Sequence, residues 1–79
     1  MVTKIDFLSK CKTALSHHFT EFGTITTINV MSEIKLKNLM PMDEVPQTLV
    51  DECIYTLFHR VKILVGKDHA YNLLKEINE

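Results

Sequence analysis

The chain has 79 residues, 46% of them hydrophobic, and its nine Lys and Arg against ten Asp and Glu give a net charge of −1. That length allows one small domain, residues 1–79, and the apolar content is typical of a folding chain and not of a disordered one. The near-neutral charge argues against a protein that coats nucleic acid, because such domains are usually strongly basic. A monomer of this size hides only about 60–65% of its unfolded surface, so we expect a homodimer or higher oligomer.

The sequence predicts a cytoplasmic protein that has no membrane partner. Its longest stretch without a charged residue, 22–32, is shorter than a membrane span, and the first residues contain no signal-like apolar run. The two cysteines, Cys11 and Cys53, allow at most one disulfide. Without an export signal we expect both thiols to be reduced.

The first predicted element is a helix from Thr3 to Phe22. Its apolar residues recur at steps of three or four, which is the spacing of one helical face: Ile5, Leu8, Cys11, Leu15, Phe19 and Phe22. Thr3, followed three residues later by Asp6, fits an N-terminal cap, and Gly23 is expected to end the helix.

The segment 24–39 is predicted to form a β-hairpin, because its apolar and polar residues alternate and are rich in Thr, Ile and Val. One face would carry Ile28, Val30, Ile34 and Leu36, and the other Thr27, Asn29, Glu33, Lys35 and Lys37. A loop at 31–33 would pair residues of like character across the strands. One continuous strand that pairs with a second subunit is the alternative. Read as a helix, the same residues scatter around the wheel.

A connector at residues 40–45 leads to a helix that begins at Pro46 and stops at Gly66. The apolar face of this helix is wide enough to need cover on two sides, and it comprises Leu49, Val50, Cys53, Ile54, Leu57, Phe58, Val61 and Leu64. Asp68 is placed to cap a last short helix that reaches Ile77. Its inward residues are predicted to be Tyr71, Leu74 and Ile77.

The predicted fold class is therefore α+β, in the order helix, β-hairpin, helix, short helix. A lone two-stranded hairpin is not stable by itself, so dimerisation is expected to complete the fold. An all-α helical-bundle dimer is the alternative fold class.

No residue pattern predicts catalysis, a bound metal or a cofactor. His17 and His18 are adjacent, so on a helix their side chains point about 100° apart and cannot share one ion. Cys11 lies two helical turns from His18, too far for a thiolate–imidazole pair. The two glycines are isolated and form no phosphate-binding loop. We therefore expect a non-enzymatic protein.

Two surfaces are candidates for binding. The first, expected to contact a protein partner, gathers adaptable apolar side chains at the hairpin tip and connector: Met31, Leu39, Met40 and Met42. The second is a mildly basic β-ribbon face that would contact nucleic acid, with Asn29, Lys35 and Lys37. The expected function is a small regulator that binds and modulates a protein partner. A nucleic-acid-binding regulator is the alternative.

Overall fold

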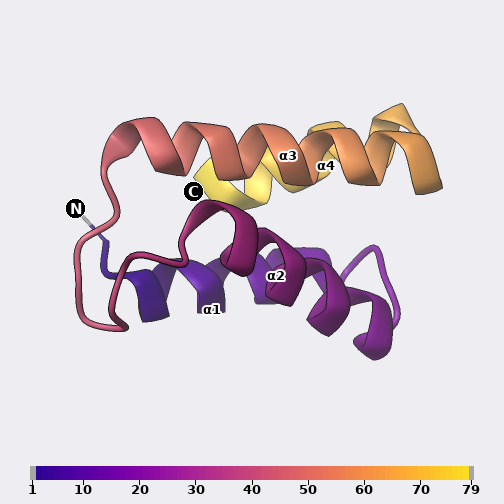
Figure 1. Cartoon of the computed structure of the whole chain (residues 1–79). Helices are drawn as coiled ribbons and strands as arrows, with labels where there is room; N and C mark the ends of the chain where they lie inside the picture. Colours follow the sequence, from indigo (N-terminus) through magenta and orange to yellow (C-terminus); the bar gives the residue numbers. More distant parts are fainter. Residues whose placement is uncertain (1, 79) are drawn as a thin grey trace.

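The computed structural model describes residues 2–78, which form four α-helices. These are α1 (Lys4–Leu15), α2 (Glu21–Lys35), α3 (Gln47–Val65) and α4 (Lys67–Asn78). Successive helices run in alternating directions, so both chain ends lie at the same end of the molecule (Figure 1). Contacts join α1 to α2, α2 to α3, α3 to α4 and α4 back to α1. The arrangement is an up-and-down four-helix bundle.

The prediction of a β-hairpin at 24–39, and with it the α+β fold class, is wrong. No strand occurs in residues 2–78, and most of this segment belongs to α2. Its buried residues are Thr24, Thr27, Ile28 and Met31, spaced along one helical face. Two of them, Thr24 and Thr27, are threonines. The alternating pattern predicted a strand partly because threonine favours strands, and it placed Thr27 on the polar face. Tertiary packing overrides their β-propensity, and the all-helical class of the alternative is the one observed.

The first helix is shorter than predicted, because α1 ends at Leu15 and not at Phe22. Residues 16–20 form a loop, and Thr20 then caps a new helix: its Oγ1 accepts the Gly23 N–H at 3.1 Å. Gly23 therefore lies in the first turn of α2 and does not end a helix. Phe22, predicted to face inward, is 81% exposed.

The helical hairpin α3–α4 agrees more closely with the sequence. Gly66 ends α3 with a φ of 108°, which confirms the predicted stop, since this backbone conformation favours glycine. Tyr71, predicted to point inward, is exposed. Ile77 is buried, which confirms its predicted inward position, and Leu74 is half-buried. The other buried residues of α4 are Ala70 and Leu73.

The segment between α2 and α3 is bound to the start of α1. The backbone N–H groups of Lys4 and Ile5 donate to the carbonyls of Asp43 and Pro41 at 2.8 and 3.0 Å. The Asp6 N–H donates to Thr3 Oγ1 at 3.3 Å, which confirms the predicted cap. These bonds satisfy N–H groups that a helix start leaves without partners.

One core lies between the four helices. It includes the fully buried side chains of Leu15, Leu36, Leu57, Leu73, Val45, Val61, Cys11 and Cys53. Val45 and Leu36 come from outside the helices, so the connecting segments close the core at one end.

Within residues 2–78, no helix has both the length and the apolar character that crossing a bilayer requires.

Candidate functional site: an apolar groove between α2 and α3

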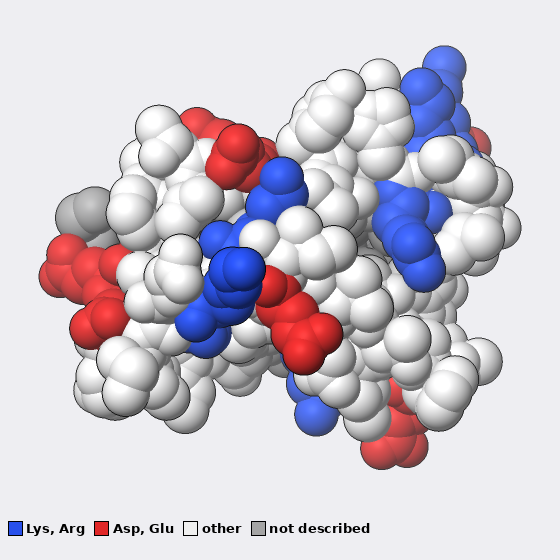
Figure 2. Space-filling model, in the orientation of Figure 1, with Lys and Arg blue, Asp and Glu red and all other residues white. Residues whose placement is uncertain are grey.

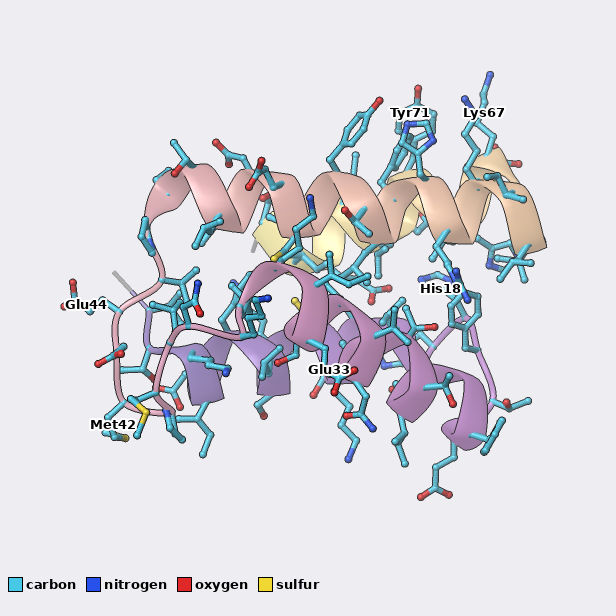
Figure 3. All side chains as sticks on the ribbon, viewed as in Figure 1. His18, Glu33, Met42, Glu44, Lys67 and Tyr71 are labelled. Atoms are coloured by element: carbon cyan, nitrogen blue, oxygen red, sulfur yellow. The ribbon has the colours of Figure 1, made fainter. Side chains whose placement is uncertain are left out.

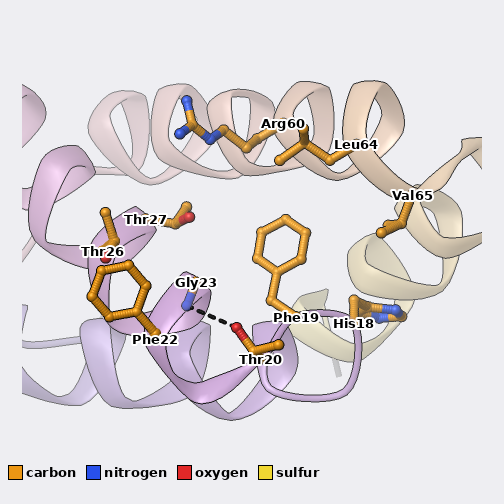
Figure 4. A pocket seen from close by; sticks show the side chains of 10 residues that line it. All are labelled: His18, Phe19, Thr20, Phe22, Gly23, Thr26, Thr27, Arg60, Leu64 and Val65. Atoms are coloured by element: carbon orange, nitrogen blue, oxygen red, sulfur yellow. Dashed lines mark hydrogen bonds between the residues drawn. The ribbon is translucent and has the colours of Figure 1, made fainter.

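A hollow of about 370 Å³ opens between the start of α2 and the end of α3 (Figure 4). It is lined by His18, Phe19, Thr20, Phe22, Gly23, Thr26, Thr27, Arg60, Leu64 and Val65. A smaller hollow of about 60 Å³ shares Thr27 and Arg60 with it and continues toward the end of α2. That hollow is also lined by Val30, Met31, Ile34, Lys35 and Thr56. We call the two together, with the adjoining Ile63, the α2–α3 groove.

Large apolar side chains form the rim of the α2–α3 groove and are open to solvent. Phe22 and Ile34 of α2 are 81% and 67% exposed, and Ile63 and Leu64 of α3 are 79% and 61% exposed. Figure 2 shows uncharged areas on the face that carries α2 and α3, interrupted by both positive and negative groups. Contiguous apolar surface of this kind marks interaction sites more often than scattered single residues do.

The depth of the groove follows from small residues on α2. Gly23 has no side chain, and Thr26 and Thr27 are short, so α2 leaves space facing α3. The neighbouring Thr24 is buried, and its Oγ1 has no hydrogen-bond partner among the described residues. On α3, Arg60 and Leu64 are one turn apart and therefore share the wall opposite.

The charged residues of the α2–α3 groove are Arg60 and Lys35, and both are positive. The ion pairs among residues 2–78 join His17 and His18 to Glu76. They involve neither Arg60 nor Lys35. The groove therefore offers an apolar surface with two unpaired positive charges along it.

A histidine cluster closes one end of the groove. The His18 side chain is 5% exposed, and its Nδ1 lies 2.9 Å from the Nδ1 of His69 on α4. Its Nε2 is 3.8 Å from Glu76 Oε1 and has no hydrogen bond. His17, in the same loop, places its Nδ1 2.9 Å from Glu76 Oε2. Burial, the largest cause, lowers the pKa of His18, and the nearby Glu76 carboxylate partly opposes that shift.

The apolar residues predicted to form one partner surface are separated in the structure. Met31 is 2% exposed in the core, and Leu39 is half-buried. Met40 and Met42 are exposed on the turn that follows, where the Asp43 carboxylate accepts the Met40 N–H at 2.8 Å. Met42 lies at the opposite end of the bundle from His18 (Figure 3). Whether Met40 and Met42 contact a partner stays a prediction.

The β-ribbon predicted to carry Asn29, Lys35 and Lys37 does not form. Asn29 is exposed in the middle of α2, Lys35 is its last residue, and Lys37 follows the helix. Only Lys35 reaches the groove. A strand ladder would align these three side chains on one face, whereas a helix turns successive residues by about 100°.

Cys11 and Cys53 are free thiols in the core, as expected of small apolar residues. Burial raises the pKa of Cys11 to about 12 and that of Cys53 to about 11, so both are protonated at neutral pH. Among residues 2–78, no group of three or more His, Cys, Asp or Glu side chains is placed to hold a metal ion.

Sequence reasoning missed the groove, although one signal was present. The apolar run 63–65 extends beyond the inward stripe of α3, so some of it had to face outward.

Comparisons of the chain with protein-family models, with curated proteins and with solved structures each found no match.

Proposed function

We propose that this protein is a small, non-enzymatic interaction module that binds and modulates a protein partner, with an amphipathic helix of the partner lying in the α2–α3 groove. The observation that carries the proposal is the open apolar rim formed by Phe22, Ile34, Ile63 and Leu64. A groove between two helices, apolar on both walls, suits a helix that presents apolar residues at i, i+3 or i+4, and i+7.

Charge specifies the partner helix further. Arg60 lies where the two hollows meet, and Lys35 lies toward the end of α2. Neither is paired within residues 2–78. A carboxylate on the partner helix would face Arg60, where a bidentate pair is geometrically favourable. Such pairs contribute mainly to orientation and specificity, while the apolar rim supplies most of the affinity.

The proposed setting is the cytoplasm. The two thiols are free and lie in the core, and reduced cysteines are typical of that compartment.

A displayed library of helical peptides tests the function without knowledge of the natural partner. We expect selected peptides to carry apolar residues at helical spacing together with an acidic residue, and to perturb backbone amides along the groove in NMR spectra. Ile34→Asp and Leu64→Asp should each weaken binding by about tenfold or more, because each introduces a charge into the apolar contact. Both side chains are exposed, so both variants are expected to fold.

Two matched variants make the test specific. Tyr71→Asp changes an exposed apolar side chain on α4, away from the groove, and should leave binding unchanged. Arg60→Glu should change the selected charge from acidic to basic. The proposal is overturned if no peptide is enriched, or if Tyr71→Asp weakens binding as much as Leu64→Asp does. It is also overturned if the groove is filled by a second copy, seen in light scattering as a dimer that Leu64→Asp dissociates.

Nucleic-acid binding is the alternative function. Binding to mixed-sequence DNA or RNA that falls steeply with added salt, and that Lys35→Glu abolishes, would overturn the proposal in favour of a nucleic-acid-binding regulator.

A further inference from the structure

The histidine cluster joins the 16–20 loop to α4 through side chains alone. His18 contacts His69 at 2.9 Å between their Nδ1 atoms, with the rings edge to face and their centroids 5.1 Å apart. His17 contacts Glu76 at 2.9 Å. These contacts connect residues 51 and 59 positions apart in the chain, so they hold the loop in its place on the bundle.

The contact between the two Nδ1 atoms sets a limit on protonation. A neutral imidazole has one N–H and one acceptor nitrogen, whereas a protonated imidazole donates from both nitrogens and accepts at neither. At 2.9 Å one Nδ1 must donate and the other accept. The contact therefore survives with one of the two imidazoles protonated, but not with both.

Burial makes the second protonation unfavourable in the folded protein. The His18 side chain is 5% exposed, and its Nε2 has no hydrogen-bond partner. The ionisable groups that face it are His17 from its own loop and His69 and Glu76 from α4. Burial lowers the pKa of His18 most, His69 and His17 lower it further, and Glu76 raises it. Of the charged groups on α3, Arg60 lines the same hollow, and it adds no negative charge.

We propose that the His18–His69 pair is a pH-sensitive latch, which holds His18 of the 16–20 loop against α4 at neutral pH and releases that side chain when both imidazoles are protonated, while His17 stays in contact with Glu76. Release requires no further reagent: the second proton comes from solvent, the shared Nδ1 hydrogen bond breaks, and two imidazolium groups separate into water. Histidine pairs suit this role because their charge changes near physiological pH.

The latch reaches the α2–α3 groove through the same loop. Phe19 lines the groove, and Thr20 Oγ1 caps the first turn of α2 by accepting the Gly23 N–H. Loss of the His18 contact therefore loosens the end wall of the groove next to Phe19 and, through Thr20, the start of α2. This coupling rests on the proposed function, whereas the latch itself does not. Partner binding is expected to weaken at mildly acidic pH.

Two-dimensional amide NMR spectra of the whole chain, recorded with a chelator from about pH 7.5 to about pH 5, test the latch directly. The amides of 16–20 are expected to change together, with a midpoint below the ordinary histidine value of about 6.5. The amides of 39–44, at the other end of the bundle, should show no such transition. The latch is disproved if the loop amides show no common transition in this range.

Two histidine variants separate the latch from general effects of acid. In His69→Gln, the amide side chain donates or accepts without taking up a proton, so His18 should stay against α4 throughout the range. His59→Gln removes a histidine of α3 outside the cluster and should leave the transition unchanged. An unaltered transition in His69→Gln would overturn the latch.

The affinity of a groove-binding peptide then tests the coupling. Between about pH 7.5 and about pH 5.5 it should fall about fivefold or more in the natural chain and about twofold or less in His69→Gln. A loop transition without a change in affinity would disprove the coupling and leave the latch standing. Failure to select any peptide would overturn the proposed function alone, since the amide spectra need no partner.

Discussion

Single residues at the helix ends decide where this chain turns. Thr3 and Thr20 each accept a backbone N–H of the helix that follows, and Gly66 adopts a φ of 108° between α3 and α4. The two glycines of the sequence have different structural roles. Gly66 supplies a backbone conformation that other residues rarely adopt, while Gly23 supplies space beside Phe19 in the first turn of α2.

Gly66→Ala is expected to lower the free energy of unfolding by about 1–3 kcal/mol, because φ 108° with ψ 166° lies in a region that is almost exclusive to glycine. The added methyl group meets no atom within 4 Å, so the loss would come from backbone strain alone. Urea denaturation followed by circular dichroism measures it. Gly23→Ala is the control and should cost less, since it gains helix propensity while crowding Thr20 Oγ1 at 3.3 Å. Equal losses in the two variants would contradict the assignment.

At the scale of the element, α2 is where sequence and structure differ most. The alternating pattern placed Val30 on the buried face of a strand and Met31 in a loop. In the helix these environments are exchanged, with Met31 2% exposed and Val30 43% exposed. The buried stripe of α2 contains two threonines, so its apolar signal is weak. What makes it helical is the cover supplied by α1 and α3.

Met31→Ala should therefore lower the free energy of unfolding by about 2–5 kcal/mol, the range for truncating a large buried side chain. Val30→Ala should cost less than about 1 kcal/mol, because Val30 is largely on the surface and alanine favours the helix. Chemical denaturation of the two variants gives the comparison. The reverse order of losses would support a hairpin at this position.

At the scale of the whole molecule, the bundle supplies from within one chain most of the cover that α3 requires. Leu57 and Val61 are fully buried between the helices, whereas Leu64 remains exposed at the groove. A dimer was expected partly because a short hairpin would need a second subunit to cover it. Since residues 24–39 form no hairpin, this reason no longer applies. Self-association itself stays a prediction. The buried thiols of Cys11 on α1 and Cys53 on α3 report on the integrity of the core as a whole.

Stability is expected to fall at alkaline pH because of these two thiols. Their pKa values in the folded chain, about 12 and about 11, exceed the ordinary thiol value, so the folded state keeps protons that the unfolded state releases. Their contribution is complete below the unfolded pKa and is lost as pH rises toward the folded values. Between about pH 7.5 and about pH 9.5 the loss should be about 1.5–3 kcal/mol.

Urea denaturation at the two pH values checks this prediction. The Cys11→Ala, Cys53→Ala double variant is the control. It is less stable at both values because of the cavities it creates, but its alkaline loss should be smaller. An alkaline loss equal to that of the natural chain would show that the thiols are not its source.

The sequence by itself determined those features that depend on local chemistry. The cap at Thr3, the stop at Gly66 and the core positions of Cys11 and Cys53 follow from hydroxyl geometry, glycine φ and helical spacing within a few residues. For the same reason the helices around α1, α3 and α4 were predicted, with errors at the end of α1 and in the inward face of α4.

Only the tertiary structure decided the rest. The state of 24–39 depends on which neighbours bury it, and the α2–α3 groove combines residues from helices far apart in sequence, such as Phe22 and Leu64. The His18–His69 contact spans 51 positions, so no local pattern could indicate it. Packing between distant segments determines burial, and burial determines which side chains are core, which are surface and which change their pKa.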